Sequence, residues 1–243
     1  MYIFLELVFL FCIGSMLGWV LELFFRRIVH GKWVNPGFLI GPYLPIYGTG
    51  LVALSLMYYF LNDKSLNPAI IILLMGLIMT LIELIGGLIA LKDNVRLWDY
   101  SNRWMNYKGV ICPLFSAIWT LVGAVFYYVL APFVIKNLEW FSHNLYFSYF
   151  IGIFTGVIVI DFCYSTGVYL KIQKFAKDNS IIVKYEQLKM SIKDFQNKER
   201  EKYSFIHPFS QTKSLKEYLE VYKEKHNTHK EKLHEYIEKI HNK

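Results

Sequence analysis

The chain has 243 residues, of which 55% are hydrophobic and only 19% are charged, and its mean hydropathy is +0.32. This composition excludes an ordinary soluble domain and predicts an all-α, polytopic membrane protein. Most of the net charge of +7 comes from residues after Leu170, where lysines alternate with acids. Because nucleic-acid binding needs an unbroken basic patch, no nucleic-acid partner is expected.

Five apolar stretches are long enough to cross a bilayer, which takes about 20 residues each. They are Tyr2–Phe25, Phe38–Leu61, Pro68–Leu91, Val110–Val134 and Leu145–Leu170. In the short loops, basic residues gather after the first and third stretches. The positive-inside rule therefore places the amino terminus outside and the carboxyl terminus in the cytoplasm.

Among the acidic residues inside these apolar stretches are Glu22, Glu83 and Asp161. A carboxylate at bilayer depth costs about 2.5–3.5 kcal/mol on insertion scales, so it usually faces a partner or a cavity. We therefore expect Glu83 and Asp161 to line a polar pathway. Glu22 lies one helical turn before Arg26, so an interfacial ion pair explains it as well as a place in the pathway does.

The segment 35–50, NPGFLIGPYLPIYGTG, is rich in proline and glycine at the start of the second apolar stretch. Proline removes a backbone donor, and irregular backbone at membrane depth needs protein or water to satisfy it. One interpretation is a broken or re-entrant helix start, and the alternative is a kinked start in the interface. The residues concerned are Asn35, Pro36, Gly37, Gly41, Pro42, Pro45, Tyr47 and Gly48.

The loop after the third stretch, WDYSNRWMN, combines aromatic and hydrogen-bonding side chains. Its polar residues Asp99, Asn102, Arg103 and Asn106 have the groups needed to line a polar pocket, and a solvated loop is the alternative. Its aromatic residues fit a belt at the level of the lipid headgroups; they are Trp98, Tyr100 and Trp104.

Residues 14–61 and 75–134 show the same order of features. Glu22 and Glu83 are each followed by a basic loop and then by GFLIGPYLPIYG or GVICPLFSAIWT. The aligned pairs are Gly37 with Gly109, Tyr43 with Phe115, Ile46 with Ile118 and Tyr47 with Trp119. A parallel internal repeat explains this order, and chance similarity between apolar segments is the alternative.

Residues 173–243 are predicted to form a helical cytoplasmic tail, separate from a membrane domain of residues 1–172. Apolar residues recur in the tail at spacings of three and four, typical of coiled-coil-like helices, with a break at His207-Pro208. A helical hairpin or a dimerising helix follows, and with it a homo-oligomer. His226 and His229 take seam positions, so we expect them to pack or to make the seam sensitive to pH, and no metal site is predicted.

Several of these motifs together resemble a known family. They are GWVLE at 18–22, NPGFLIGPYLPIYG, the acid at Glu83, and WDYSN followed by NYKGVICPLFSAIW. These motifs resemble the bacterial membrane family called putative ABC-transporter type IV, the CmpB-type permeases, over about Gly14 to Trp119. The resemblance implies a multi-pass permease component in the bacterial cytoplasmic membrane. It also implies a separate ATPase subunit, because this chain has no GxxxxGK[ST] motif.

The predicted function is therefore a permease component whose intramembrane acids line a pathway for an unidentified substrate. An integral-membrane enzyme or a lipid-binding protein at the cytoplasmic leaflet is the second hypothesis, although HExxH and GxSxG motifs are absent. A membrane anchor that recruits partners through its tail is the third. No cofactor is predicted, and membrane lipids are partners in every case.

Overall fold

The computed structural model describes residues 2–31, 33–62, 64, 66–203, 219–221 and 223–224. Its helices are α1 (Tyr2–His30), α2 (Pro45–Leu61), α3 (Pro68–Lys92), α4 (Pro113–Val125), α5 (Ala131–His143), α6 (Leu145–Asp178) and α7 (Tyr185–Tyr203), with the π-helical η1 (Phe126–Leu130) before α5. The two-residue strands β1 (Val95–Arg96) and β2 (Val183–Lys184) pair in parallel. The sequence did not predict these strands, which are too short to show a pattern.

In the described part of the chain, four helical spans are long and apolar enough to cross a membrane. They are Ile3–Val29, Pro68–Lys92, Pro113–Leu138 and Tyr146–Asp178. The remaining apolar helix, α2, has 17 residues and is about 25 Å long at 1.5 Å per residue. The stretch predicted over Phe38–Leu61 is thus helical only from Pro45, because prolines and glycines interrupt the backbone before that point.

Prolines mark where three of the helices begin. Pro45, Pro68 and Pro113 each occupy the first turn of α2, α3 and α4. A proline at this position loses no intrahelical hydrogen bond, and its fixed φ suits the helix. The sequence therefore sets these starting points locally, before any tertiary packing.

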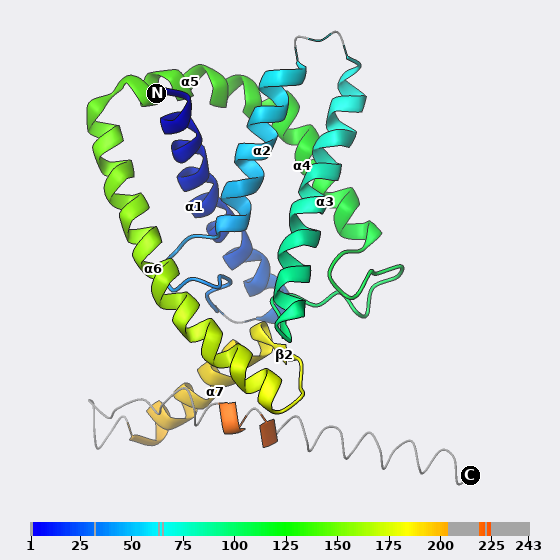
Figure 1. The fold of residues 1–243 in the computed structure, drawn as a ribbon, viewed down its shortest axis with the longest axis vertical. Helices are drawn as coiled ribbons and strands as arrows, with labels where there is room; N and C mark the ends of the chain where they lie inside the picture. Colours follow the sequence, from blue (N-terminus) through cyan, green and yellow to red (C-terminus); the bar gives the residue numbers. More distant parts are fainter. Residues whose placement is uncertain are drawn as a thin grey trace.

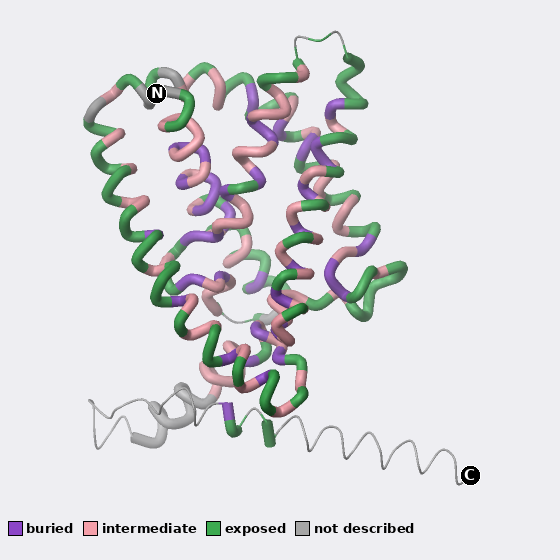
Figure 2. The backbone as a smooth tube through the Cα atoms, viewed as in Figure 1, coloured by how far each residue is buried: buried purple, intermediate pink, exposed green. Residues whose placement is uncertain are grey.

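Helices α1 to α4 alternate in direction, α5 crosses one end of the molecule, and α6 returns along one side (Figure 1). Helix α1 packs mainly on α2, and α3 packs mainly on α4. Buried residues face the interior between these pairs, whereas most of α6 is exposed (Figure 2). One apolar core joins α2, α3, η1 and the start of α5; its residues are Leu54, Ile71, Met75, Met79, Phe126 and Ala131.

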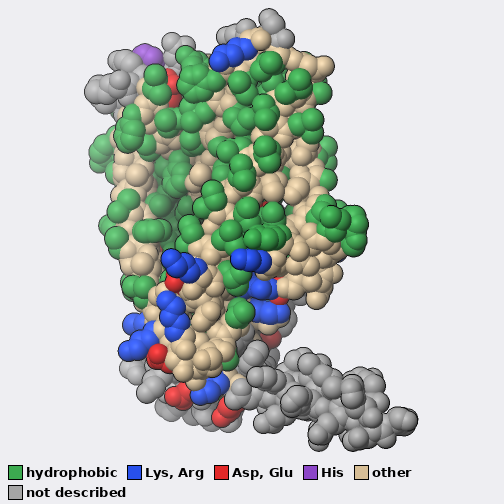
Figure 3. Space-filling model, turned by 45° about the vertical axis from the view of Figure 1, so that its right-hand side comes forward, with side chains coloured by type: hydrophobic (Ala, Val, Ile, Leu, Met, Phe, Trp, Pro, Cys, Tyr) green, Lys and Arg blue, Asp and Glu red, His purple; other side chains and the backbone are tan. Residues whose placement is uncertain are grey.

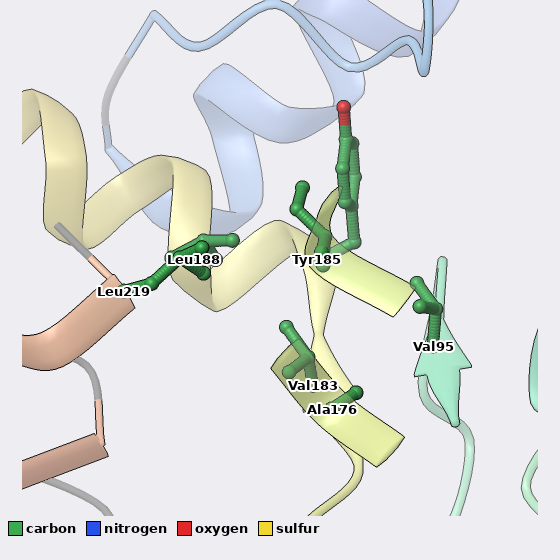
Figure 4. Close-up of a cluster of buried hydrophobic side chains, with 7 residues drawn as sticks. Val95, Ala176, Val183, Tyr185, Leu188 and Leu219 are labelled. Atoms are coloured by element: carbon green, nitrogen blue, oxygen red, sulfur yellow. The ribbon is translucent and has the colours of Figure 1, made fainter. Parts of the chain in front are cut away.

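The beginning of the predicted tail packs against the bundle. Helix α6 continues to Asp178, past its predicted end at Leu170, and β2 then pairs with β1. A second apolar cluster follows, in which Leu219 lies against Leu188 of α7 (Figure 4). Its buried residues are Val95, Ile172, Ala176, Val183, Tyr185, Leu188 and Leu219. The predicted seam with His226 and His229, and the break at His207-Pro208, lie outside the described residues.

The surface is divided by charge. Hydrophobic side chains are spread over the upper part of the visible face, and Lys and Arg gather mainly below them, near the end that carries α7 (Figure 3). Large apolar side chains are exposed along the apolar helices, including Leu73 and Ile89 on α3, Leu121 on α4 and Ile160 on α6. In water this surface would be costly, and lipid removes the cost.

Candidate intramembrane acid site

Asp161 lies in the middle of α6 and faces the non-helical segment between α1 and α2. Its carboxylate accepts hydrogen bonds from the backbone N–H groups of Ile40 at 3.2 Å and Gly41 at 2.8 Å. The hydroxyls of Tyr43 and Ser165 donate to it at 2.6 and 2.8 Å. Backbone donors outside a helix must find acceptors at membrane depth, so Asp161 fastens this segment to α6.

Asn35 organises the first part of the same segment. Its side-chain oxygen accepts hydrogen bonds from Trp19 Nε1 at 2.9 Å and from the backbone N–H of Gly37 at 3.1 Å. Its amide nitrogen donates to the carbonyls of Leu39 at 3.1 Å and Ile40 at 2.7 Å. One asparagine thus replaces several hydrogen bonds that a helix would have made.

The other predicted residues of this segment lie on both sides of the helix start. Pro36, Gly37, Gly41 and Pro42 precede α2, and Pro45, Tyr47 and Gly48 lie in its first turn. The segment rises from the end of α1 to the start of α2 beside α6 (Figure 1). It is therefore a non-helical connection packed among α1, α2 and α6.

Glu22 lies on α1 at the end of the molecule where basic residues gather. Tyr47 on α2 donates its hydroxyl hydrogen to Glu22 Oε2 at 2.9 Å. Arg26 Nε pairs with Glu22 Oε1 at 3.1 Å, and its Nη1 pairs with Glu186 of α7 at 2.8 Å. The sequence anticipated the Arg26 pair, but the link to the tail through Glu186 had no sequence signal.

Glu83 lies on α3 and is only 5% exposed. Tyr100, from the loop after β1, donates its hydroxyl hydrogen to Glu83 Oε1 at 2.9 Å. The indole Nε1 of Trp119 on α4 donates to Glu83 Oε2 at 3.0 Å. Both donors are neutral. Among the described residues Glu83 is therefore hydrogen-bonded but, unlike Glu22, forms no ion pair.

The two acids are connected through their aromatic donors. The rings of Tyr47 and Trp119 meet edge to face, with centroids 6.0 Å apart and an interplanar angle of 67°. This is a favourable geometry for an aromatic pair. Glu22, Tyr47, Trp119 and Glu83 thus form one row of polar groups running from the α1–α2 pair to the α3–α4 pair.

The contacts around this row occur at matching positions in the two helix pairs. Ser15 and Gly76 each lie seven residues before the acid, and Gly48 and Thr120 each directly follow the aromatic donor. A Cβ added at Gly48 would overlap Ser15 Oγ, and a Cβ added at Gly76 would overlap Thr120 Oγ1. The position seven residues before the acid thus touches the position after the aromatic donor in both pairs. The glycine of this contact is on the second helix of one pair, at Gly48 of α2, and on the first helix of the other, at Gly76 of α3.

A second contact repeats the pattern one turn away. A Cβ at Gly14 would lie 2.9 Å from Leu51 Cβ, and a Cβ at Gly123 would lie 2.9 Å from Met75 Cβ. Gly14 and Met75 each lie eight residues before the acid, and Leu51 and Gly123 each lie four residues after the aromatic donor. Small residues at such contacts let helix backbones approach closely in a membrane.

Asp99 forms a charged cluster on the loop outside the bundle. Arg96 and Lys184 each place a nitrogen 2.6 Å from its carboxylate, and Ser101 donates its backbone N–H at 3.0 Å. Partial burial favours a higher pKa for Asp99, but the hydrogen bonds from Lys184, Ser101 and Arg96 outweigh it and hold the pKa well below its usual range. Asp99 therefore joins β1, this loop and β2.

The remaining polar residues of the loop serve its own conformation or face outward. Asn106 donates to the carbonyls of Ser101 at 3.0 Å and Arg103 at 2.8 Å, and it accepts from the N–H of Gly109 at 2.9 Å. Asn102 and Arg103 have exposed side chains. The structure thus does not bring Asp99, Asn102, Arg103 and Asn106 together around a single point.

Helix α7 contacts the non-helical segment from the charged end. Lys189 Nζ lies within hydrogen-bonding distance of the carbonyls of Asn35 and Gly37, and 5.0 Å from the ring centroid of Tyr185. Desolvation by burial, helped by the positive charge of Arg26, lowers the pKa of Lys189 to about 8.

Several residues that hold the acids and the segment after α1 were not predicted from the sequence to do so. Tyr100 and Trp119 bind Glu83, Tyr43 binds Asp161, and Glu186 and Lys189 bind around the end of α1 and the segment after it. The alignment of Tyr47 with Trp119 was the one available signal. It placed both donors at equivalent positions without showing what they bind.

Chemically, the row offers two carboxylates held by neutral aromatic donors inside an apolar bundle. Such groups can attract a cation or exchange a proton, and they are rare in lipid-embedded helices unless function retains them. Among the described residues, no group of three or more His, Cys, Asp or Glu side chains is placed to hold a metal ion.

The fold and this row of acids define the class: a multi-pass helical membrane protein with ionisable side chains inside its bundle. The family model described as Putative ABC-transporter type IV matches residues 9–166. Since this match covers well over half of the chain, the chain belongs to that family. The matched range contains Glu22, Glu83 and Asp161 and ends before α7. No solved structure matches the chain.

Proposed function

We propose that the chain is the membrane-spanning component of a transporter, with Glu22 and Glu83 lining a polar pathway between the α1–α2 and α3–α4 pairs. The main support is the position of Glu83, which is 5% exposed and hydrogen-bonded to the neutral donors Tyr100 and Trp119. Burying a carboxylate without a basic partner costs stability. A protein keeps such a group where a passing ion or proton needs it.

We further propose that residues 14–61 and 75–134 form a parallel repeat. The matched contacts Ser15–Gly48 and Gly76–Thr120, together with the two acid–aromatic hydrogen bonds, support this. Helices α1 and α3 run in the same direction, as a parallel repeat requires (Figure 1). Many transporters place their binding sites where such repeats meet, and the Tyr47–Trp119 contact lies at this boundary.

Asp161 has a different role in this proposal. Its carboxylate is occupied by two backbone N–H groups and two hydroxyls, so it positions the non-helical segment that forms one wall beside Glu22. A fully hydrogen-bonded acid has little capacity left for a passing cation. Asp161 is thus a positioning residue, and Glu83 is the main candidate for contact with the substrate.

The family name suggests an ATPase partner, which this chain would need for ATP-driven transport. The end of the molecule with the Lys and Arg side chains and α7 is the proposed cytoplasmic side of a bacterial inner membrane, by the positive-inside rule (Figure 3). An ATPase would have to dock at this end. Mild-detergent purification with mass spectrometry of co-purifying proteins tests it, and repeated absence of any ATPase would contradict this part of the proposal.

Cysteine accessibility tests the pathway without knowledge of the substrate. Gly86 lies one turn after Glu83, and a Cβ there meets only ordinary contacts, 3.6 Å from Ile46 and 3.7 Å from Trp98. In a Cys163→Ser background, Gly86→Cys is expected to react with a charged, membrane-impermeant methanethiosulfonate, because thiolates form only where water reaches. Its matched control is Ile85→Cys, which is 58% exposed on the apolar surface of α3.

The expected result is rapid labelling of Gly86→Cys and none of Ile85→Cys. Labelling of neither position in intact membranes would overturn the water-filled pathway. Labelling of both would show that the lipid-facing assignment of α3 is wrong. The remaining native cysteines, Cys12 and Cys112, are buried, and the background protein reports their contribution.

A further inference from the structure

We propose that the tip of the loop between β1 and α4 is an anchor in the bilayer interface that binds anionic phospholipid headgroups. The tip is residues 103–108. Trp104 is 79% exposed, Met105 is 67% exposed and Tyr107 is 51% exposed. Arg103 and Lys108 flank these three apolar side chains and are themselves exposed. Indole rings with basic side chains are the combination that favours the headgroup region.

The exposed tip is a built structure with its own internal hydrogen bonds. Asn106 holds it with three of them, to the carbonyls of Ser101 and Arg103 and from the N–H of Gly109. Met105 and Lys108 adopt positive φ angles of 49° and 53°, which few residues other than glycine accept without strain. A conformation held this closely presents its aromatic and basic side chains in a set orientation.

The base of the loop is fixed to the bundle. The ring of Tyr100 stacks on Phe115 with centroids 4.3 Å apart, and its hydroxyl binds Glu83. Trp98 Nε1 donates to the carbonyl of Val110 at 2.8 Å. These contacts hold the base of the loop in place, and among the described residues none covers the apolar side chains of the tip.

The position of the tip indicates what covers it. The loop projects sideways from the bundle, away from α7 and the charged end (Figure 1). Hydrophobic side chains project from the same side just above most of the Lys and Arg side chains (Figure 3). The neighbouring surface of α4 is apolar and exposed at Leu114 and Leu121, so the tip continues a surface that faces lipid.

Charge then selects the lipid. Arg103 and Lys108 lie beside the inserted side chains, and Lys108 Nζ lies 5.5 Å from the ring centroid of Tyr107. A basic residue near an anionic membrane surface gives about a fivefold preference for that surface. The expected ligand is therefore a phosphate-bearing anionic headgroup, such as that of phosphatidylglycerol.

Depth measurement of the full chain in liposomes tests the insertion. A spin label on Met105→Cys, in the Cys163→Ser background, is expected to be more accessible to oxygen than to a water-soluble nickel chelate. The matched control is a label on Asp178→Cys, at the exposed end of α6, where the nickel chelate should dominate. Equal nickel accessibility at both positions would overturn the insertion and would indicate a water-exposed surface for a protein.

Fluorescence quenching tests the headgroup. The difference in quenching between the wild type and Trp104→Phe isolates Trp104 from the other tryptophans. Brominated phosphatidylglycerol should quench this component more than brominated phosphatidylcholine, and the difference should vanish in the double variant Arg103→Gln/Lys108→Gln. Salt near 1 M, where the screening length is about 3 Å, should also reduce it. Equal quenching by the two lipids in the wild type would overturn the selection of anionic headgroups.

Discussion

In the α1–α2 pair, Glu22 accepts a hydrogen bond from Tyr47 and pairs with Arg26. In the α3–α4 pair, Glu83 accepts a hydrogen bond from Trp119, and Tyr100 takes the place of the arginine. The helix packing is alike in the two pairs, but the neutralisation of the acid differs. We infer that Glu22 has a partner of opposite charge for its stability, whereas Glu83 keeps a charge or proton available for function.

The connections inside the two pairs differ as well. The α1–α2 connection is a non-helical segment held by Asp161 and Asn35, and the α3–α4 connection is a hairpin loop held by Asp99 and Asn106. Both use one acid and one asparagine to satisfy backbone or basic groups. The helix contacts are therefore similar in the two pairs, whereas the connections between the helices differ in conformation.

The largest expected effect comes from exchanging small residues between the pairs. Gly48→Thr alone forces a side chain onto Ser15, and such overpacking costs about 1–3 kcal/mol or more. Adding Ser15→Gly removes the clash with Ser15 Oγ but leaves the Phe11 carbonyl in overlap with the added Cβ, so it should restore only part of the loss. Thermal unfolding followed by size-exclusion chromatography in detergent measures both variants.

The control for this exchange is Gly152→Thr on α6, where an added Cβ meets nothing within 4 Å. It should change the unfolding temperature little. If the double variant is no more stable than Gly48→Thr alone, the two contacts are not equivalent and the proposed repeat loses its main support.

A smaller and more local effect is expected from Asp161→Ala. The N–H groups of Ile40 and Gly41 lose their acceptor, at a cost of about 2 kcal/mol, which corresponds to roughly 30-fold faster hydrogen exchange. Exchange measured by mass spectrometry should rise in residues 33–44 and remain unchanged in α3 and α4. Thr166→Val, which removes only a bond to the same helix, is the control. A rise spread evenly over the bundle would contradict the local role.

The two acids should also differ when each is replaced by glutamine. Glu83→Gln removes a buried charge that has no basic partner, and this gain offsets the cost of setting an amide N–H against the donor of Tyr100 or Trp119, about 1–3 kcal/mol. Glu22→Gln breaks a partly exposed ion pair, worth about 1 kcal/mol or less, with no such gain. Glu22→Gln should therefore lower the unfolding temperature at least as much as Glu83→Gln. A clearly larger loss in Glu83→Gln would show that the carboxylate of Glu83 serves stability, against its proposed role in the pathway.

The smallest expected effect is a dependence on pH at Lys189. Its pKa falls from 10.5 to about 8 on folding, so between these values the unfolded chain binds more protons than the folded one. Stability attributed to Lys189 should therefore rise as pH increases from about 8 toward 10.5, and it should stay level below 8. We expect a gain of less than about 1 kcal/mol per pH unit, below the ideal limit of 1.36.

Comparing the wild type with Lys189→Met at pH 7.5 and 9.5 isolates this contribution from tyrosines that titrate in the same range. The unfolding temperature of the wild type should improve relative to the variant at the higher pH. A relative loss at pH 9.5 would mean that the positive charge of Lys189 stabilises its contact with the carbonyls of Asn35 and Gly37.

Local patterns in the sequence predicted much of the architecture. Apolar length indicated the spans that became α1, α3, the α4–α5 run and α6, and the predicted start at Pro68 matches that of α3, whereas α4 begins at Pro113, after the predicted start at Val110. The same patterns identified the three acids and the family. These features depend on residues close together in the chain, where hydropathy and backbone chemistry act without tertiary contacts.

Tertiary structure decided what each acid binds. Trp119 reaches Glu83 from 36 residues away, and Tyr43 reaches Asp161 from 118 residues away. It also packed α7 against the segment after α1. Hydropathy predicts where an acid lies along a helix, but hydrogen-bond partners depend on which helices become neighbours. For that reason the sequence alone could find the three acids, and only the folded chain could separate Glu83 from Glu22 and Asp161.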